Sequence, residues 1–282
     1  MRKTVLFALA VFLLQGCSNK ENASLLLEDA QSLFEKGSLN DAKLRIDSLQ
    51  STYPKEFNLI KQGRQLLRRI ELKENERNYA YADSMLTVKQ QQAQDMSKEF
   101  NFVKDEKYEE LGNYIYKGLL VENNVQRSYI RTGVDEYGRI YIASVYYGNA
   151  NINHTGMKAE IPDGSNVQTL EVPFDGGRNY RFSDGGAKSE IVTYNEEKEN
   201  GIIGFIAANA GQRIKITYTG GKTYILYLDD FTKKAIVKTS EMAAVLKDII
   251  RLQQEKKVSE GKITYLQNRI SVKEEQLNKE EK

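Results

Sequence analysis

Apolar residues recur at helical spacing near both ends of the chain and at strand spacing in the middle. The most regular series lies near the C-terminus, where every third or fourth residue from Met242 to Leu277 belongs to one stripe. Eight of the eleven positions in this stripe are apolar. A heptad pattern of this length is typical of a coiled coil, so we expect residues 237–282 to form a coiled-coil helix.

A second long helix is predicted over residues 55–111, which contain no proline and one glycine, Gly63. Its second half repeats the three-four spacing between Tyr79 and Val103. Because the two helical regions flank one domain, we expect them to pair antiparallel within one chain as the two strands of a coiled-coil stalk. The alternative is that residues 242–277 associate between chains and form a homo-oligomer.

Residues 24–54 predict a pair of shorter helices before the long one. Gly37 is suited to end the first helix, Ser38 and Asp41 match a capping box for the second, and Tyr53-Pro54 ends it. The apolar spacing of this segment is similar to one helical hairpin of the tetratricopeptide type. The resemblance covers about 30 residues without a second copy, so we expect a single hairpin that packs on the following helix.

Between the helical regions the periodicity changes to that of strands. Residues 112–236 carry most of the glycines, and turn signals separate short alternating or apolar runs rich in Tyr, Ile and Val. This pattern is typical of an antiparallel sandwich or barrel. The expected strands are residues 126–132, 139–147, 167–174, 179–182, 190–194, 202–209, 213–219 and 222–228.

Finer expectations concern the last hairpin of this β domain. Gly220-Gly221 predicts a two-residue turn, because primed turns require positive φ. Residues 224–228 are apolar on both faces, which predicts a central strand, whereas the alternation over 213–219 predicts one solvated face. The expected fold class is α+β, in which a helical hairpin and a long antiparallel coiled-coil stalk carry an inserted antiparallel β-sandwich or barrel domain.

The N-terminus combines a basic start, an apolar run and the single cysteine of the chain. Arg2 and Lys3 precede about ten apolar residues, Val5–Leu14, roughly half the length that a helix needs to span a bilayer. The stretch Leu14-Gln15-Gly16-Cys17 that follows resembles the lipobox of a bacterial lipoprotein signal. The alternative is an ordinary secretory signal beside a stray cysteine.

The lipoprotein resemblance implies a set of expectations for the mature chain. Residues 1–16 would be removed, Cys17 would be acylated, and residues 17–23 would form a lipidated tether. The expected location is the bacterial cell envelope, and within that family Ser18 after the cysteine is compatible with the outer membrane. The expected partners are the membrane, through the lipid on Cys17, and an envelope protein.

The charge balance argues against a nucleic-acid-binding protein. The chain has 41 basic and 39 acidic residues, and removal of Arg2 and Lys3 leaves equal numbers. A mature protein without net charge has no general attraction to the phosphate backbone.

Candidate catalytic or metal-binding residues are few. His154 is the only histidine and lies in a segment that we interpret as an exposed loop, so neither a zinc site nor a Ser-His-Asp triad is expected. Asp163, Asp175 and Asp184 each precede glycine and are expected to form turns rather than a calcium loop. No metal or cofactor is therefore expected.

Tyrosine is the enriched residue type, with 17 in the chain. Tyr146 and Tyr147 are the candidate binding residues, because strand neighbours point to opposite faces and one of the two should point outward. We expect a non-enzymatic interaction or scaffold protein that presents its β domain on the stalk. The alternatives are a ligand-binding lipoprotein that captures a glycan or peptide through its tyrosines, and a hydrolase using an acidic pair such as Glu196-Glu197 or Asp229-Asp230.

Overall fold

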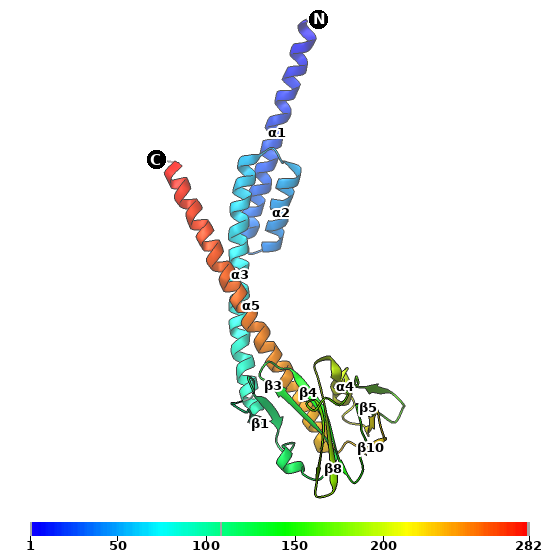
Figure 1. Ribbon diagram of the computed structural model, residues 1–282. Coiled ribbons are helices and arrows are strands. Elements are labelled where there is room, and N and C mark those ends of the chain that lie inside the picture. Colours follow the sequence, from blue (N-terminus) through cyan, green and yellow to red (C-terminus); the bar gives the residue numbers. More distant parts are fainter. Residues whose placement is uncertain (1, 108, 281–282) are drawn as a thin grey trace. The chain divides into compact units, whose positions relative to one another are not determined.

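The computed structural model describes the backbone of residues 2–107 and 109–280. The side chains of residues 1–18, 108, 184, 196 and 274–282 lie outside that description, so the expectations for Cys17 and Leu277 fall outside the described side chains. The chain divides into two compact units, residues 1–84 with 253–282 and residues 85–252. Figure 1 shows the elements of both units along the chain. None of the helices in the described part is long and apolar enough to cross a membrane.

Three helices form the first unit at its N-terminal end. They are α1 (Arg2–Glu35), α2 (Leu39–Thr52) and the first part of α3 (Phe57–Ser97). Ala30, Ile46 and Leu66, one from each helix, belong to the shared apolar core. The predicted hairpin that packs on the following helix is therefore confirmed, and it is shown in blue in Figure 1. The α1 helix also runs through residues 17–23, where a tether was expected, since no glycine or proline interrupts that segment.

The turn of this hairpin is only partly the one predicted. Gly37 has a φ of 80°, the left-handed conformation that favours glycine at a helix end. Ser38 stands at the N-cap of α2, but its side chain makes no capping hydrogen bond, so the predicted capping box is wrong. Tyr53 is the C-cap residue of α2, as predicted, and its N–H donates to the Leu49 carbonyl.

The predicted long helix over residues 55–111 ends earlier than expected, at Ser97. Residues Phe100–Val103 form strand β1, which pairs antiparallel with β2 (Asn113–Tyr116). Phe100 is buried, and its ring meets the Tyr116 ring edge-on at 5.5 Å. The prediction failed because Phe100 and Val103 fit the helical series equally well, while burial against the neighbouring strand decides the conformation.

The C-terminal helix α5 (Asp230–Glu280) begins seven residues before the predicted start at 237. The Asp229 carboxylate accepts a hydrogen bond from the Thr232 N–H at 2.6 Å, which satisfies a free donor of the first turn. Within the second unit, Lys89 of α3 pairs with Asp248 of α5 at 2.9 Å. Within the first unit, Lys256 of α5 pairs with Asp83 of α3 at 2.6 Å.

The predicted stripe of α5 is the less exposed side of that helix. Its apolar and small members are buried or half-buried as far as the described side chains extend. They are Met242, Val245, Ile249, Leu252, Ser259, Ile263, Leu266 and Ile270.

Two antiparallel sheets dominate the second unit in the described part of the chain. The larger has six strands in the order β1-β2-β3-β4-β8-β7, and the smaller has four in the order β10-β9-β5-β6. Besides β1 and β2 the strands are β3 (Tyr129–Asp135), β4 (Ile140–Gly148), β5 (Gly156–Glu160), β6 (Asn166–Gln168), β7 (Asn179–Asp184), β8 (Ala187–Asn195), β9 (Lys215–Thr219) and β10 (Tyr224–Tyr227). The short helices η1 (Val121–Asn124), η2 (Glu196–Glu199) and α4 (Ile202–Ala208) connect them.

Both sheets contribute to one apolar core. Ile142 and Val192 come from the larger sheet, Met157 and Ile216 from the smaller, and Ile206 from α4. All five side chains are fully buried. The larger sheet therefore has one face toward this core. Because successive side chains of a strand point to opposite faces, alternate residues of β3, β4 and β8 lie on the other, outer face.

Two predicted strands are wrong or much shorter than expected. Of residues 202–209, the first seven are helical in α4 and Asn209 is its C-cap, since Ile202, Ile203 and Ile206 together form one buried stripe on a helix. Of residues 167–174, the two at the start belong to β6, which ends at Gln168. The pattern also missed β1, β2 and β5.

The last hairpin pairs β9 with β10 as predicted, but its turn is longer. Four residues, Gly220–Thr223, separate the two strands. A Cβ on Gly221 would lie 2.0 Å from the Ile152 carbonyl oxygen, so the glycine permits close packing of this turn on the loop before β5. β10 is an edge strand rather than a central one, with Ile225 52% exposed, whereas the alternation predicted for β9 is confirmed.

Candidate functional site

His154 lies in a buried chain of polar side chains rather than in an exposed loop, so that expectation was wrong. Its side chain is fully buried. The ring nitrogen Nε2 lies 2.9 Å from the Ser144 Oγ, and Nδ1 lies 3.1 Å from a carboxylate oxygen of Glu190. The imidazole stacks on the Tyr218 ring, with centroids 4.8 Å apart.

Glu190 holds the loop that carries the histidine. Its carboxylate accepts the backbone N–H groups of Ile152 at 2.7 Å, Asn153 at 2.9 Å and His154 at 3.1 Å. Asn153 has a φ of 55°, and its side-chain oxygen accepts a hydrogen bond from Arg181. Residues 152–154 thus fold around the Glu190 carboxylate, and the His154 ring is held in the core.

The pKa values of this pair are shifted in the same direction. Burial by itself raises the pKa of Glu190, but hydrogen bonds from Asn153, His154 and Ile152 outweigh it and leave the pKa below its ordinary value. Burial lowers the pKa of His154, although Glu190 opposes the shift. Near neutral pH the carboxylate is therefore ionised and the imidazole is neutral, with Nδ1–H donating to Glu190 and Nε2 accepting from Ser144.

Ser144, His154 and Glu190 thus have the hydrogen-bond order of a hydrolytic triad, in which an acid orients a histidine that activates a serine. The serine, however, is fully buried in the middle of β4, between Ile130 of β3 and Val192 of β8. Its hydroxyl also lies 3.2 Å from the Tyr194 hydroxyl. In this conformation a substrate does not reach the Ser144 Oγ. We call the hydrogen-bonded chain Ser144–His154–Glu190 the relay, and it connects the loop before β5 to the larger sheet.

A polar cavity of about 470 Å³ lies on the outer face of the same sheet. The strand register places Arg131 opposite Ala143, which faces Thr193, and places Gly133 opposite Tyr141, which faces Asn195. The intervening residues, such as Ile142, point into the shared core. The cavity is lined by Glu109, Asn113, Arg131, Asp135, Arg139, Ile140, Tyr141, Thr193 and Asn195.

Arg131 is one of the two cations that line this cavity. Its Nε is buried without a hydrogen-bond partner, and so is the Oδ1 of Asn195. The nearby carboxylate of Asp135 is already engaged by Arg139, with Nε 2.5 Å from Oδ2. Among the described residues no carboxylate forms an ion pair with Arg131. Glu109 is exposed at the edge of the cavity, where its carboxylate accepts the backbone N–H of Asp105.

Aromatic residues lie on the same outer face as Arg131. Burial raises the pKa of Tyr141, so its phenol stays protonated and supplies a hydrogen-bond donor. Tyr129 is buried two positions before Arg131 on β3. Burial raises the pKa of Tyr129, and the positive charge of Arg131 opposes that rise. On β7 the rings of Tyr180 and Phe182 stack with centroids 6.3 Å apart. The cavity and the face around it combine two arginines, amide and hydroxyl groups and several rings, which is a composition suited to recognition.

The candidate pair Tyr146-Tyr147 lies on opposite faces of β4, as predicted. Tyr146 is 5% exposed and points into the core, where its ring meets Tyr224 edge-on at 5.1 Å. Tyr147 is half-buried on the outer face. The tyrosine that points outward is therefore Tyr147.

The other sequence candidates occupy turns and helix ends. Asp163 accepts the Ser165 N–H, and Asp175 accepts the N–H groups of Gly177 and Asn179, which confirms the turn interpretation for both. The side chains of Asp184 and Glu196 lie outside the described residues. Asp229 caps α5, and Asp230 is exposed and pairs with Lys233, so each carboxylate of this acidic pair has a role at the helix start.

Sequence reasoning missed the residues that meet at these two sites. Arg131, Tyr141 and Asn195 share a face because of the strand register, which the sequence does not encode locally. One signal was present, since β3 and β8 carry polar residues on both faces. In the described part of the chain no group of His, Cys, Asp and Glu side chains is arranged to hold a metal ion.

No protein-family model matches the chain, and comparisons with curated proteins and with solved structures find no match.

Proposed function

We propose that the protein is a lipid-anchored, non-enzymatic binding protein of the bacterial cell envelope. Its second unit, residues 85–252, which we call the β unit, binds an acidic group of a partner at Arg131. The lipobox resemblance around Cys17 supports the anchor and, with Ser18, the outer membrane. The equal numbers of basic and acidic residues in the mature chain support a protein or glycan partner over nucleic acid.

The helices support the proposal of a stalk. Lys89–Asp248 in one unit and Asp83–Lys256 in the other join α3 to α5, and α5 turns its predicted stripe inward. These contacts are those expected of an antiparallel coiled coil. Two sheets that share one core support a β-sandwich in the second unit.

The single observation that carries the function is an outer-face cavity lined by the half-buried residues Arg131 and Asn195, whose Nε and Oδ1 atoms have no hydrogen-bond partner. A buried polar atom without a partner costs free energy, which a ligand that supplies the partner recovers. The Nε–H of an arginine matches a carboxylate oxygen, and the Asn195 oxygen matches an N–H or O–H of the same ligand. An acidic sugar or an acidic peptide has both groups.

The buried Ser144–His154–Glu190 relay is the feature that would favour a hydrolase instead. A nucleophile must meet its substrate, and the side chains of all three residues are fully buried. We therefore assign the relay a structural role and place binding on the opposite face of the sheet.

The test compares Arg131→Gln with Arg213→Gln in the lipid-anchored protein. Arg213 is an exposed arginine of the same unit whose guanidinium lies 3.9 Å from the centre of the Tyr227 ring, so the control removes the same charge elsewhere. Partners are crosslinked in cells, solubilised in detergent and quantified after purification. A hydrogen-bonded charge is worth about 1.5–3 kcal/mol, so recovery should fall about tenfold or more for Arg131→Gln alone. Equal recovery from both variants would reject the site.

The anchor is tested separately by Cys17→Ser. The variant should lose labelling by a tagged fatty acid and should leave the membrane fraction, because the thiol is the acceptor that the resemblance implies. Equal labelling of the variant and the natural protein would show that Cys17 is not acylated.

A further inference from the structure

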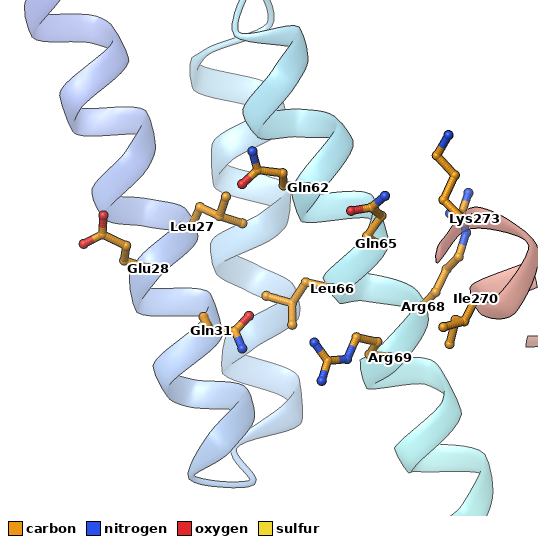
Figure 2. Close-up of a pocket in the computed structure, with 10 residues that line it drawn as sticks. All are labelled: Leu27, Glu28, Gln31, Gln62, Gln65, Leu66, Arg68, Arg69, Ile270 and Lys273. Carbon is orange, nitrogen blue, oxygen red and sulfur yellow. The ribbon is translucent and has the colours of Figure 1, made fainter. Parts of the chain in front are cut away.

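A groove runs along the start of α3 in the first unit. It consists of two cavities of about 460 and 430 Å³ that share Gln65, Arg68 and Lys273 in their walls. Figure 2 shows the first cavity, with Leu27 and Leu66 between α1 and α3 and with Arg68 reaching the Ile270–Lys273 segment of α5. We refer to these joined cavities as the basic groove.

The basic groove carries an excess of positive charge. Its lining contains one carboxylate, Glu28, and five cations, which are Lys61, Arg64, Arg68, Arg69 and Lys273. Among the described side chains no carboxylate forms an ion pair with Lys61, Arg64 or Arg68. The first unit therefore presents a local positive surface, although the mature chain as a whole is neutral.

Apolar side chains accompany these cations. Leu27, Leu66 and Ile270 line the groove, and Phe57 at its end is 76% exposed. An exposed ring beside cations is the composition of surfaces that lie at the membrane interface, where the ring enters the headgroup layer and the cations meet phosphates.

The position of the groove relative to Cys17 identifies the occupant. Leu27 of α1 lies against Gly63 of α3, with 3.9 Å between the Leu27 side chain and the Cβ that Gly63 lacks. Both helices run in the same direction, because α2, which follows α1 and precedes α3 in the sequence, runs opposite to each of them (Figure 1). Phe57, six residues before Gly63, is thus level with about residue 21, four residues or about 6 Å from Cys17 along α1. The end of the groove that carries Phe57 is the end nearest the proposed lipid.

We propose that the basic groove docks on the phosphate headgroups of anionic phospholipids in the membrane that anchors the protein. The proposal rests on the proposed acylation of Cys17, which would hold the groove at the bilayer surface. Docking would orient the first unit on the membrane, whereas the lipid alone fixes one point. Phe57 enters the interface, and Lys61, Arg64 and Arg68 contact phosphate oxygens.

The test uses the full mature chain with Cys17→Ser, so that binding is measured without the lipid. The protein is mixed with vesicles of equal parts phosphatidylglycerol and phosphatidylcholine, or of phosphatidylcholine alone, and the bound fraction is measured by co-sedimentation. Binding is expected for the anionic vesicles and not for the neutral ones. Inorganic phosphate at equal ionic strength should not displace the protein, because one phosphate does not replace a surface of headgroups.

Matched variants locate the binding surface. The triple variant Lys61→Gln, Arg64→Gln and Arg68→Gln should bind about 100-fold more weakly, at about fivefold for each charge near the surface. The control Lys36→Gln, Lys257→Gln and Lys262→Gln removes the same charge from exposed positions of the first unit outside the groove and should bind unchanged. Phe57→Ser, which changes no charge, should also weaken binding to anionic vesicles.

The outcomes separate docking from the proposed anchor. Equal losses for both triple variants would show general charge attraction and overturn the proposal, as would equal binding to neutral vesicles or displacement by free phosphate. A protein that fails to bind vesicles but is acylated at Cys17 in cells contradicts the docking alone. Vesicle binding by a protein that is not acylated contradicts the anchor alone.

Discussion

The role assigned to the buried relay predicts a large effect of Glu190→Gln on the stability of the β unit. The Glu190 carboxylate accepts the backbone N–H groups of Ile152 and Asn153 on one oxygen, and those of His154 and its ring on the other. Glutamine keeps one acceptor oxygen but places an NH₂ group where the second oxygen was. That NH₂ faces two donors.

The magnitude follows from the hydrogen bonds that glutamine cannot replace. The His154 ring can change tautomer so that Nδ1 accepts from the new amide, but the His154 backbone N–H is then left buried without a partner. An unsatisfied buried donor costs about 1–3 kcal/mol. Replacement of the charged acceptor by a neutral one at the remaining bonds costs about 1 kcal/mol more. The unfolding free energy should therefore fall by about 2–4 kcal/mol.

The assay is equilibrium urea unfolding of the Cys17→Ser mature chain, followed by the near-ultraviolet circular dichroism of its tyrosines. The matched control is Glu171→Gln, an exposed position of the same unit, which should change the unfolding free energy by less than about 0.5 kcal/mol. A change of that small size for Glu190→Gln, or a gain in stability, would refute the reasoning. It would mean that the cost of burying the charge cancels its hydrogen bonds.

Three further predictions concern pH, the C-terminal helix and a turn. Because the folded pKa of His154 is lowered, the folded state binds fewer protons than the unfolded state below about pH 6.5. Stability should therefore fall as the pH drops from 6.5 to 5, with a slope of up to about 1.4 kcal/mol per pH unit, and His154→Asn should flatten that slope in urea titrations. Leu266→Ala should cost about 2–4 kcal/mol in thermal or urea unfolding, whereas Tyr265→Ala, at a 62% exposed position, should cost much less; equal costs would contradict the burial of that stripe. Gly138→Ala should cost more than about 2 kcal/mol, because φ is 78° and its Cβ would lie 2.6 Å from a backbone oxygen of α5, while Gly164→Ala, with positive φ but open space, should cost about 1 kcal/mol.

The long periodic elements were predictable from the sequence because their signal repeats. The stripe from Met242 onward contains many turns of helix, so a single polar member such as Ser259 does not change the assignment. The hairpin around Gly37 was also predictable, because a positive φ at a helix end leaves few choices of residue. Short segments behaved differently. Residues 202–208 contain apolar neighbours that fit a strand or a helix, and contacts with the core selected the helix.

The candidate site could not be predicted because it depends on pairing between distant segments. Arg131 and Asn195 are separated by 64 positions in the chain, and the register of the sheet places them on the same face, where they line one cavity. His154 was misplaced for a related reason. An Asn-rich loop is usually exposed, but Glu190 lies 36 positions away and offers this loop a buried acceptor.

The relay and the cavity are linked through the register of the larger sheet. Ser144 and Glu190 project from β4 and β8 toward the core, whereas Arg131 and Asn195 project from β3 and β8 toward the outer face. A slip of one residue between these strands would exchange the faces, placing a guanidinium in the core and apolar side chains in water. Hydrogen-bond partners buried at fixed positions oppose such a slip more strongly than interchangeable apolar contacts, since the relay has partners in one register alone. On this argument the buried acid, histidine and serine specify the strand alignment that keeps the proposed binding residues together on the opposite side.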